Sequence, residues 1–150
     1  MTQREKFLVH CMKYHGLPYI WGGADPKKGL DCSGLVQHLL TWLKLDPPGD
    51  QTADVLMKFF KQSSKGKVVT TDTCDLGDLV FYGGSSGRAT HIGVILGDGL
   101  MFEAGGGGST CTTPEIAKKL GASVRVSPIH RRSDLICVVR PNGIPWAKVV

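Results

Sequence analysis

Long apolar runs are missing from this chain of 150 residues. No uninterrupted hydrophobic stretch approaches the length of a membrane span, and residues 1–5 lead into a segment of mixed polarity. We therefore expect no transmembrane segment, no insertion into a membrane and no cleavable signal peptide. Synthesis in the cytoplasm follows from this expectation, and the final location of the protein stays open.

Paired cysteines are missing as well. The number of cysteines is odd and no two of them form a C-x-x-C pair; they are Cys11, Cys32, Cys74, Cys111 and Cys137. This pattern excludes a disulfide framework and a zinc-finger type of site. Cys11 and His15 are four residues apart in a helical segment, but no second ligand pair accompanies them. We expect no metal, no cofactor and synthesis in a reducing compartment.

Positive charge is in moderate excess. The 18 Lys and Arg residues outnumber the 13 Asp and Glu residues, which gives a net charge of +5 and an isoelectric point near 9.0. Such a surplus favours anionic partners, for example nucleic acid, acidic lipid or a cell-wall polymer. The basic residues are scattered, however, and the sequence has no zinc finger, basic zipper or aromatic RNA-binding signature. We therefore expect no nucleic-acid partner.

The order of the periodic patterns predicts the fold class. Up to Gly66 apolar residues recur at helical spacing, whereas most later segments alternate as strands do. We predict helices over residues 2–16, from 32 to before 47, from 52 onwards and over 114–120, and strands over 68–71, 79–82, 91–96, 100–104, 123–129 and 135–140. Helices followed by strands are typical of an α+β domain, here with N-terminal helices packed on a small antiparallel β-sheet. The length suits a single domain over residues 1–150.

Cys32 is the first candidate for chemistry. It lies in the segment Asp31-Cys32-Ser33-Gly34, at the start of the second predicted helix. The positive end of a helix dipole favours a thiolate over a thiol, and a thiolate is the nucleophilic form of cysteine. In the simpler interpretation, Asp31 only caps the helix and Cys32 is a small packed residue.

His91 is the candidate base. It begins the alternating segment 91–96, and Gly93 leaves space beside its imidazole. A base is commonly oriented by a third polar group. A histidine at a strand end that is satisfied by water is the alternative.

Glu103 is the candidate for that third group, and the register of the hairpin decides whether it can reach His91. A two-residue turn at Asp98-Gly99 would place Glu103 opposite Val94, on the wrong face. A three-residue loop over 97–99 would pair Gly93 with Glu103, on the same face as His91. We predict the three-residue loop, with a left-handed conformation at its last residue. A surface-exposed strand glutamate is the alternative.

Four segments together carry a family resemblance. They are GLPYIWGG (residues 16–23), DCSGLVQ (31–37), LGDLVFY (76–82) and HIGV (91–94). In this order and at these distances, they resemble the NlpC family of papain-like cell-wall peptidases. The resemblance extends from about residue 5 to about residue 141.

The resemblance implies a papain-like cysteine peptidase fold and hydrolysis of peptide bonds in peptidoglycan stem peptides. The bond cut in the family is typically that between D-glutamate and diaminopimelate or lysine. Cys32 matches the nucleophile and His91 the base. Tyr19 matches a tyrosine that positions substrate or the oxyanion, whereas Asp31 and Ser33 match positions that line the stem-peptide pocket in members that bind a free N-terminal amine.

Glu103 departs from the commoner pattern, which has a histidine as third polar residue. A carboxylate can also orient and stabilise an imidazolium, so we predict a Cys-His-Glu site. This version resembles tail-associated hydrolases of bacteriophages.

Trp21 is predicted to form a wall of the substrate groove, with core packing as the alternative. Residues 105–108 are predicted to form a mobile loop beside the cleft.

The same residues could also serve other functions. One alternative is a papain-like amidase or acyltransferase on another amide or ester, because formation of the acyl-enzyme is common to all of them. Another is a catalytically idle structural tail or wall-binding component. Action at the cell wall would require a route out of the cytoplasm, for which a phage tail or a secretion partner is the expectation. The sequence leaves the oligomeric state open.

Overall fold

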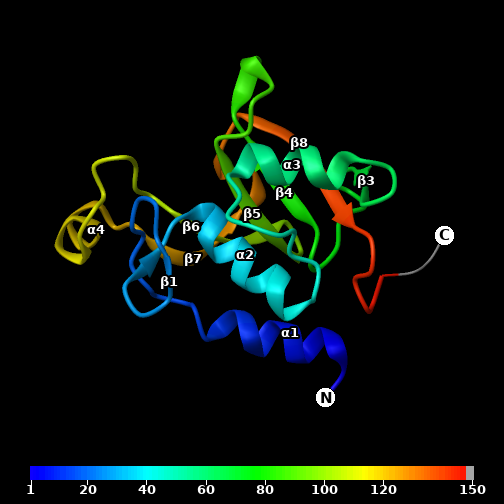
Figure 1. The fold of residues 1–150 in the computed structure, drawn as a ribbon, viewed down its shortest axis with the longest axis horizontal. Helices are drawn as coiled ribbons and strands as arrows, with labels where there is room; N and C mark the ends of the chain where they lie inside the picture. Colours follow the sequence, from blue (N-terminus) through cyan, green and yellow to red (C-terminus); the bar gives the residue numbers. More distant parts are fainter. Residues whose placement is uncertain (148–150) are drawn as a thin grey trace.

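The computed structural model describes residues 1–147 and has the predicted α+β architecture, with helices packed on an antiparallel sheet (Figure 1). The helices are α1 (Gln3–Met12), α2 (Cys32–Trp42), α3 (Ala53–Lys61) and α4 (Pro114–Leu120). The main sheet has the strand order β3-β8-β4-β5-β6-β7. Its strands are β3 (Gly66–Val69), β4 (Leu79–Tyr82), β5 (His91–Gly97), β6 (Leu100–Gly105), β7 (Ser123–Pro128) and β8 (Leu135–Pro141).

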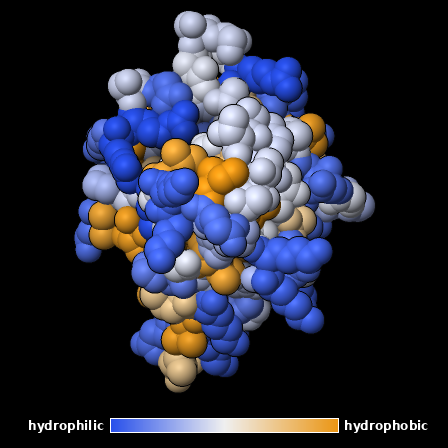
Figure 2. All heavy atoms as spheres, turned by 90° about the vertical axis from the view of Figure 1, so that its left-hand side faces the viewer, coloured by the Kyte–Doolittle hydropathy of each residue, from blue (hydrophilic) through white to orange (hydrophobic). Residues whose placement is uncertain are grey.

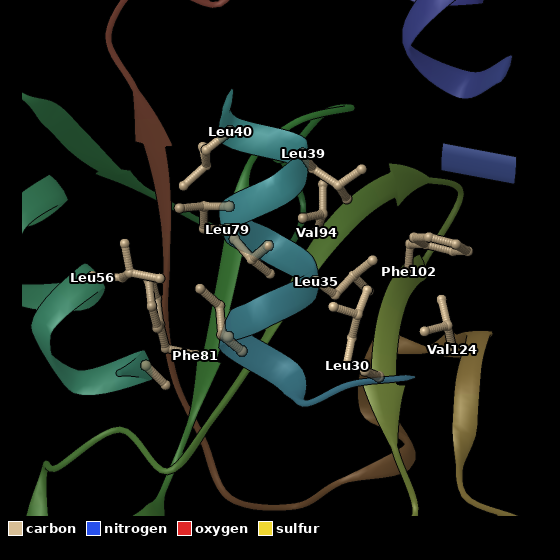
Figure 3. Packing of buried hydrophobic residues seen from close by; sticks show 14 of the residues in the cluster. Leu30, Leu35, Leu39, Leu40, Leu56, Leu79, Phe81, Val94, Phe102 and Val124 are labelled. Carbon is tan, nitrogen blue, oxygen red and sulfur yellow. The ribbon is translucent and has the colours of Figure 1, made fainter. Parts of the chain in front are cut away.

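Helix α2 packs across the middle of the sheet, against β5 and β6, and α3 packs against β3 and β8. In Figure 3, side chains of α2 point toward the sheet and meet side chains of β4, β5 and β6. The residues of this contact are fully or almost fully buried: Leu35, Leu39, Leu40, Leu79, Phe81, Val94 and Phe102. Burial of a large apolar side chain contributes about 1.5–3 kcal/mol, so this contact fixes α2 firmly on the sheet.

The opposite face of the sheet carries a second, smaller cluster. Its buried members are Val80, Tyr82, Ile95, Met101, Ile129 and Val138. The Tyr82 hydroxyl donates a hydrogen bond of 2.7 Å to the Ile129 carbonyl. Side chains alternate along β5, so His91 lies on this face with Ile95, and its ring centre is 5.8 Å from that of Tyr82. His91, the first residue of β5, therefore packs against this cluster.

The predicted elements correspond closely to those of the structure, with two differences. Thr2 and Glu5 form a capping box at the start of α1, but the helix ends at Met12 and does not extend to Gly16. The chain leaves the helix because the Gly16 amide donates to the Val124 carbonyl of β7 at 2.9 Å. The segment before α2, predicted as loop, contains a two-stranded ladder of β1 (Ala24–Asp25) and β2 (Gly29–Leu30).

The β5–β6 hairpin has the predicted register, reached through a different turn. Val94 pairs with Phe102, and this alignment places Gly93 opposite Glu103. The three-residue loop is wrong, because Gly97 pairs with Leu100 and only two residues, at 98 and 99, form the turn. Both have positive φ values, 53° and 75°, as the turn favoured in hairpins requires, so the left-handed conformation at residue 99 is confirmed. A bulge between residues 95 and 97 absorbs the extra residue.

The surface is mixed in polarity. On the face shown in Figure 2, hydrophobic residues lie in small groups between hydrophilic ones. Within residues 1–147, no helix combines the length and the apolar character that crossing a membrane requires.

Asp78, in the LGDLVFY segment, ties the start of β4 to β8. Its side chain is completely buried, and its two oxygens accept hydrogen bonds of 2.9 and 2.8 Å from Arg140. It also accepts the amide of Asp75 at 2.8 Å. Because β4 is paired with β5, this ion pair supports the strand that carries His91.

Replacing Asp78 by alanine should lower the free energy of unfolding by about 3 kcal/mol, because Arg140 loses its buried counter-ion. Urea denaturation followed by circular dichroism measures the change. The matched control is Asp72→Ala, which removes a nearby exposed carboxylate and should change stability by no more than about 0.5 kcal/mol. Equal effects in the two variants would contradict the structural role of Asp78.

Candidate active site

Cys32 is the first residue of α2, and the chain around it is fixed by backbone contacts. Asp31 is the N-cap, and its Oδ1 accepts the Gly34 amide at 2.6 Å and the Ser33 hydroxyl at 3.3 Å. A side chain at Gly34 would overlap the carbonyl of Gly23, to which the Asp31 amide donates at 3.0 Å. Glycine at 34 therefore lets the start of α2 pack directly on the preceding loop.

The environment of Cys32 does not by itself favour the thiolate. Burial, and after it the charge of Asp31, raise the pKa of the Cys32 thiol; backbone N–H groups, among them that of Ile92, lower it, and the net result is a pKa of about 11. The positive end of the α2 dipole favours the thiolate, as the sequence predicts, but desolvation of the charged form acts against it. An ionised Cys32 at neutral pH needs a partner that takes its proton.

His91 lies at the first position of β5 and is bonded to Glu103. The distance from Nε2 of His91 to Oε1 of Glu103 is 2.7 Å, and the two residues are only 7% and 3% exposed. A carboxylate accepts hydrogen bonds, so this contact assigns the ring proton to Nε2. Nδ1 of the neutral imidazole is then the nitrogen that can accept a proton.

Glu103 is held by two further side chains from β7. The Ser127 hydroxyl donates to Oε2 at 2.6 Å, and Nε of Arg125 donates to the same oxygen at 3.2 Å. Burial alone would raise the pKa of Glu103, but the hydrogen bonds from His91, Ser127 and Arg125 and the charge of His91 outweigh it and lower this pKa to about 2. Glu103 is therefore ionised at neutral pH.

Two hollows meet at Cys32, and together they form a cleft. The first has a volume of about 270 Å³, and the second about 430 Å³. Cys32, Tyr19 and Trp21 line both hollows. The first is also lined by His91, Glu103, residues 105–108, Arg125, Arg131 and Arg132. The second is also lined by Asp31, Ser33, Asp50 and Arg88.

Tyr19 and Trp21 differ in exposure. Tyr19 is 5% exposed, and a side chain at Gly107 would overlap its ring, so residue 107 packs directly against it. Trp21 is 54% exposed, and its amide donates to the Cys111 carbonyl at 2.7 Å. The segment from 105 to 111 therefore borders the cleft, as predicted, and Trp21 lies at the rim of the cleft and not in the core.

The chain is similar in sequence to proteins of a known family. The model of the NlpC/P60 family matches residues 16–125. The chain belongs to the NlpC/P60 family. The bifunctional muramidase/DL-endopeptidase CwlT of Bacillus subtilis (strain 168) is 38% identical over 106 residues, which are 69% of this chain. This chain spans 30% of the length of CwlT.

Solved NlpC/P60 structures have the same fold. The NlpC/p60 domain of the peptidoglycan hydrolase SagA superposes with a TM-score of 0.63 at 26% identity, over 93% of this chain and 98% of that domain. RipD of Mycobacterium tuberculosis superposes with a TM-score of 0.65 at 21% identity, over 93% of this chain and 97% of RipD. RipD is described as a non-catalytic NlpC/p60 domain protein adapted to peptidoglycan binding. The NlpC/P60 fold alone therefore does not establish catalysis.

In this NlpC/P60 chain the predicted residues fall into three groups. His91 and Glu103 line the first hollow, Asp31 and Ser33 line the second, and both hollows share Cys32, Tyr19 and Trp21. Ser127 and Arg125 were not predicted as site residues, because their one signal in the sequence is alternation along a strand, and the pairing of that strand with β6 is seen only in the structure. Within residues 1–147, no group of three or more His, Cys, Asp or Glu side chains is arranged to hold a metal ion.

The buried Glu103 should make stability depend on pH in the acid range. The pKa of glutamate in an unfolded chain is near 4.3, whereas the pKa of Glu103 in the folded protein is about 2. The ionised carboxylate therefore stabilises the fold fully above about pH 4.3, and this stabilisation is lost as the pH falls toward 2. The contribution at neutral pH is on the order of 3 kcal/mol. The stability difference between the parent and Glu103→Gln should therefore shrink as the pH falls from about 4.5 to 2.

Urea denaturation at several pH values measures this difference. The control is Asp72→Asn, which removes the charge of an exposed carboxylate outside the cleft. A difference between parent and Glu103→Gln that is the same at pH 7 and pH 2 would contradict the strongly held carboxylate.

Proposed function

We propose that this protein is a cysteine endopeptidase that hydrolyses peptide bonds in peptidoglycan stem peptides. The observation that carries the proposal is the buried 2.7 Å contact of His91 with Glu103, in the hollow that Cys32 also lines. Membership of the NlpC/P60 family and the name of CwlT, a DL-endopeptidase, support the substrate class. The bond that we propose is the one between D-glutamate and diaminopimelate or lysine.

Cys32 is proposed as the nucleophile and His91 as its base. The thiol gives its proton to Nδ1 of His91, and the thiolate attacks the carbonyl carbon of the scissile amide. The backbone N–H of Cys32, at the N-terminus of α2, and the Tyr19 hydroxyl stabilise the oxyanion. When this intermediate collapses, the C–N bond breaks and the imidazolium protonates the leaving amine. Water, deprotonated by His91, then attacks the thioester and releases the acid and the free thiol.

Glu103 is proposed to position His91 and to stabilise its charged form. The carboxylate is ionised and buried, so its interaction with an imidazolium is little screened by solvent. This stabilisation is what offsets the high pKa of the Cys32 thiol, because proton transfer creates a thiolate and an imidazolium together. Ser127 and Arg125 keep the carboxylate in place.

The second hollow is proposed to bind the acyl part of the stem peptide. Asp31 and Ser33 line it beside Cys32, and Trp21 forms an exposed wall. The Asp31 carboxylate already caps α2 through Oδ1, so any substrate amine would share a carboxylate whose orientation is fixed. A phage-tail or secretion partner that delivers the protein to the cell wall stays a prediction.

Digestion of purified peptidoglycan and soluble muropeptides, followed by mass spectrometry, tests the function. The parent should release new fragments that name the bond, and Cys32→Ala should lower the rate by about 10⁴-fold or more while the midpoint of unfolding stays close to that of the parent. Cys74→Ala is the matched control, because Cys74 is also half-buried but does not line either hollow. It should retain full activity.

Two outcomes would contradict the proposal. Fragments formed equally by the parent and Cys32→Ala would exclude Cys32 as the nucleophile. A folded parent that releases no fragment from any peptidoglycan would favour a binding role such as that described for RipD.

A further inference from the structure

The two hollows beside Cys32 differ in charge. Three guanidinium groups line the first hollow, those of Arg125, Arg131 and Arg132, against the single carboxylate of Glu103. The second hollow has two carboxylates, Asp31 and Asp50, and one guanidinium, that of Arg88. The first hollow is therefore the cationic end of the cleft, and it favours an anionic part of a ligand.

The three arginines of the first hollow differ in their contacts with the described part of the chain. Arg132 makes two hydrogen bonds to Asp134, of 2.9 and 2.8 Å. Arg125 donates to Glu103 and, at 3.3 Å, to the Gly121 carbonyl. Arg131 is exposed and lines the first hollow, and within residues 1–147 it has no ion pair and no side-chain hydrogen bond.

The proposed chemistry assigns the two hollows to the two halves of the substrate. His91 must lie beside the nitrogen that it protonates, and His91 lines the first hollow but not the second. The residue that carries the leaving amine therefore enters the first hollow, next to Arg131. The acyl half of the substrate then extends into the second hollow, away from these arginines.

We infer that Arg131 binds a carboxylate on the side chain of the residue that carries the leaving amine, so that the substrate is a diaminopimelate-type and not a lysine-type stem peptide. The inference rests on the proposed function and selects one of the two bonds named there, the bond from D-glutamate to diaminopimelate and not the bond to lysine. Diaminopimelate has a carboxylate at the end of its side chain, beside the amine, where lysine has the amine alone. A guanidinium fork matches a carboxylate and makes charge-assisted hydrogen bonds to it. Lysine would bring only a cation to a hollow that is already positive.

Three matched peptides test the inference. Each has the form L-Ala-γ-D-Glu-X-D-Ala, where X is diaminopimelate, the same residue with its side-chain carboxylate amidated, or L-lysine. The parent should cleave the diaminopimelate peptide with a kcat/KM about five- to tenfold above that of either other peptide. The amidated peptide keeps the size of the residue and removes only its charge, so it separates charge from shape.

Variants at Arg131 locate the effect. Arg131→Gln should bring the three kcat/KM values close together, chiefly through a higher KM for the diaminopimelate peptide, because the contact is made in both ground and transition states. Arg131→Lys keeps the charge but not the fork, and should restore part of the preference. The matched control is Lys67→Gln, which removes one exposed positive charge at the opposite edge of the sheet and should leave the preference intact.

The outcomes separate this inference from the proposed function. Equal cleavage of the three peptides by the parent would overturn the inference but would still agree with the proposed endopeptidase activity. A preference that survives in Arg131→Gln would overturn the role of Arg131. Cleavage of none of the peptides, with a folded protein, would contradict the proposed function and the inference with it.

Discussion

The buried contact between His91 and Glu103 is the interaction on which the rest of the site depends. An ionised carboxylate that is 3% exposed is stable only with several donors, and the fold supplies them from two strands: His91 from β5, and Ser127 and Arg125 from β7. Glu103 lies between them on β6, so three neighbouring strands must keep their register for the site to exist. The Asp78–Arg140 pair, which joins the residue before β4 to β8, supports the same sheet from the other side of β5.

In the proposed mechanism, Cys32 depends on this contact for its reactivity. Its position is fixed independently, by the apolar face of α2 on the sheet and by the close packing of Gly34 on Gly23. Burial in that position raises the pKa of the thiol to about 11, so placement alone leaves Cys32 protonated at neutral pH. A thiolate therefore has to form together with an imidazolium, and the charge of Glu103 stabilises the latter. In the proposed mechanism the fold thus separates two tasks: helix α2 places Cys32, and the sheet supplies the His91–Glu103 pair that ionises it.

Most of the fold could be predicted from the sequence because its signals are local. The Thr2 capping box, the Asp31 N-cap, the apolar face of α2 and the alternation along β5 each depend on residues a few positions apart. The hairpin register was predicted correctly but for the wrong reason, since the bulge before Gly97 has no clear local signal. Ser127 and the high pKa of Cys32 were missed, because the pairing of β6 with β7 and the desolvation of a thiol depend on contacts distant in sequence.

The rate of alkylation of Cys32 by iodoacetamide reports the ionisation of its thiol without any substrate, and mass spectrometry can follow it from pH 5 to pH 11 in the parent and in His91→Ala. Cys32 of the parent should react readily at neutral pH. In His91→Ala the reaction should become fast only as the pH rises toward about 11, the pKa of the buried thiol. Profiles that coincide in the two proteins would contradict the claim that the His91–Glu103 pair ionises Cys32.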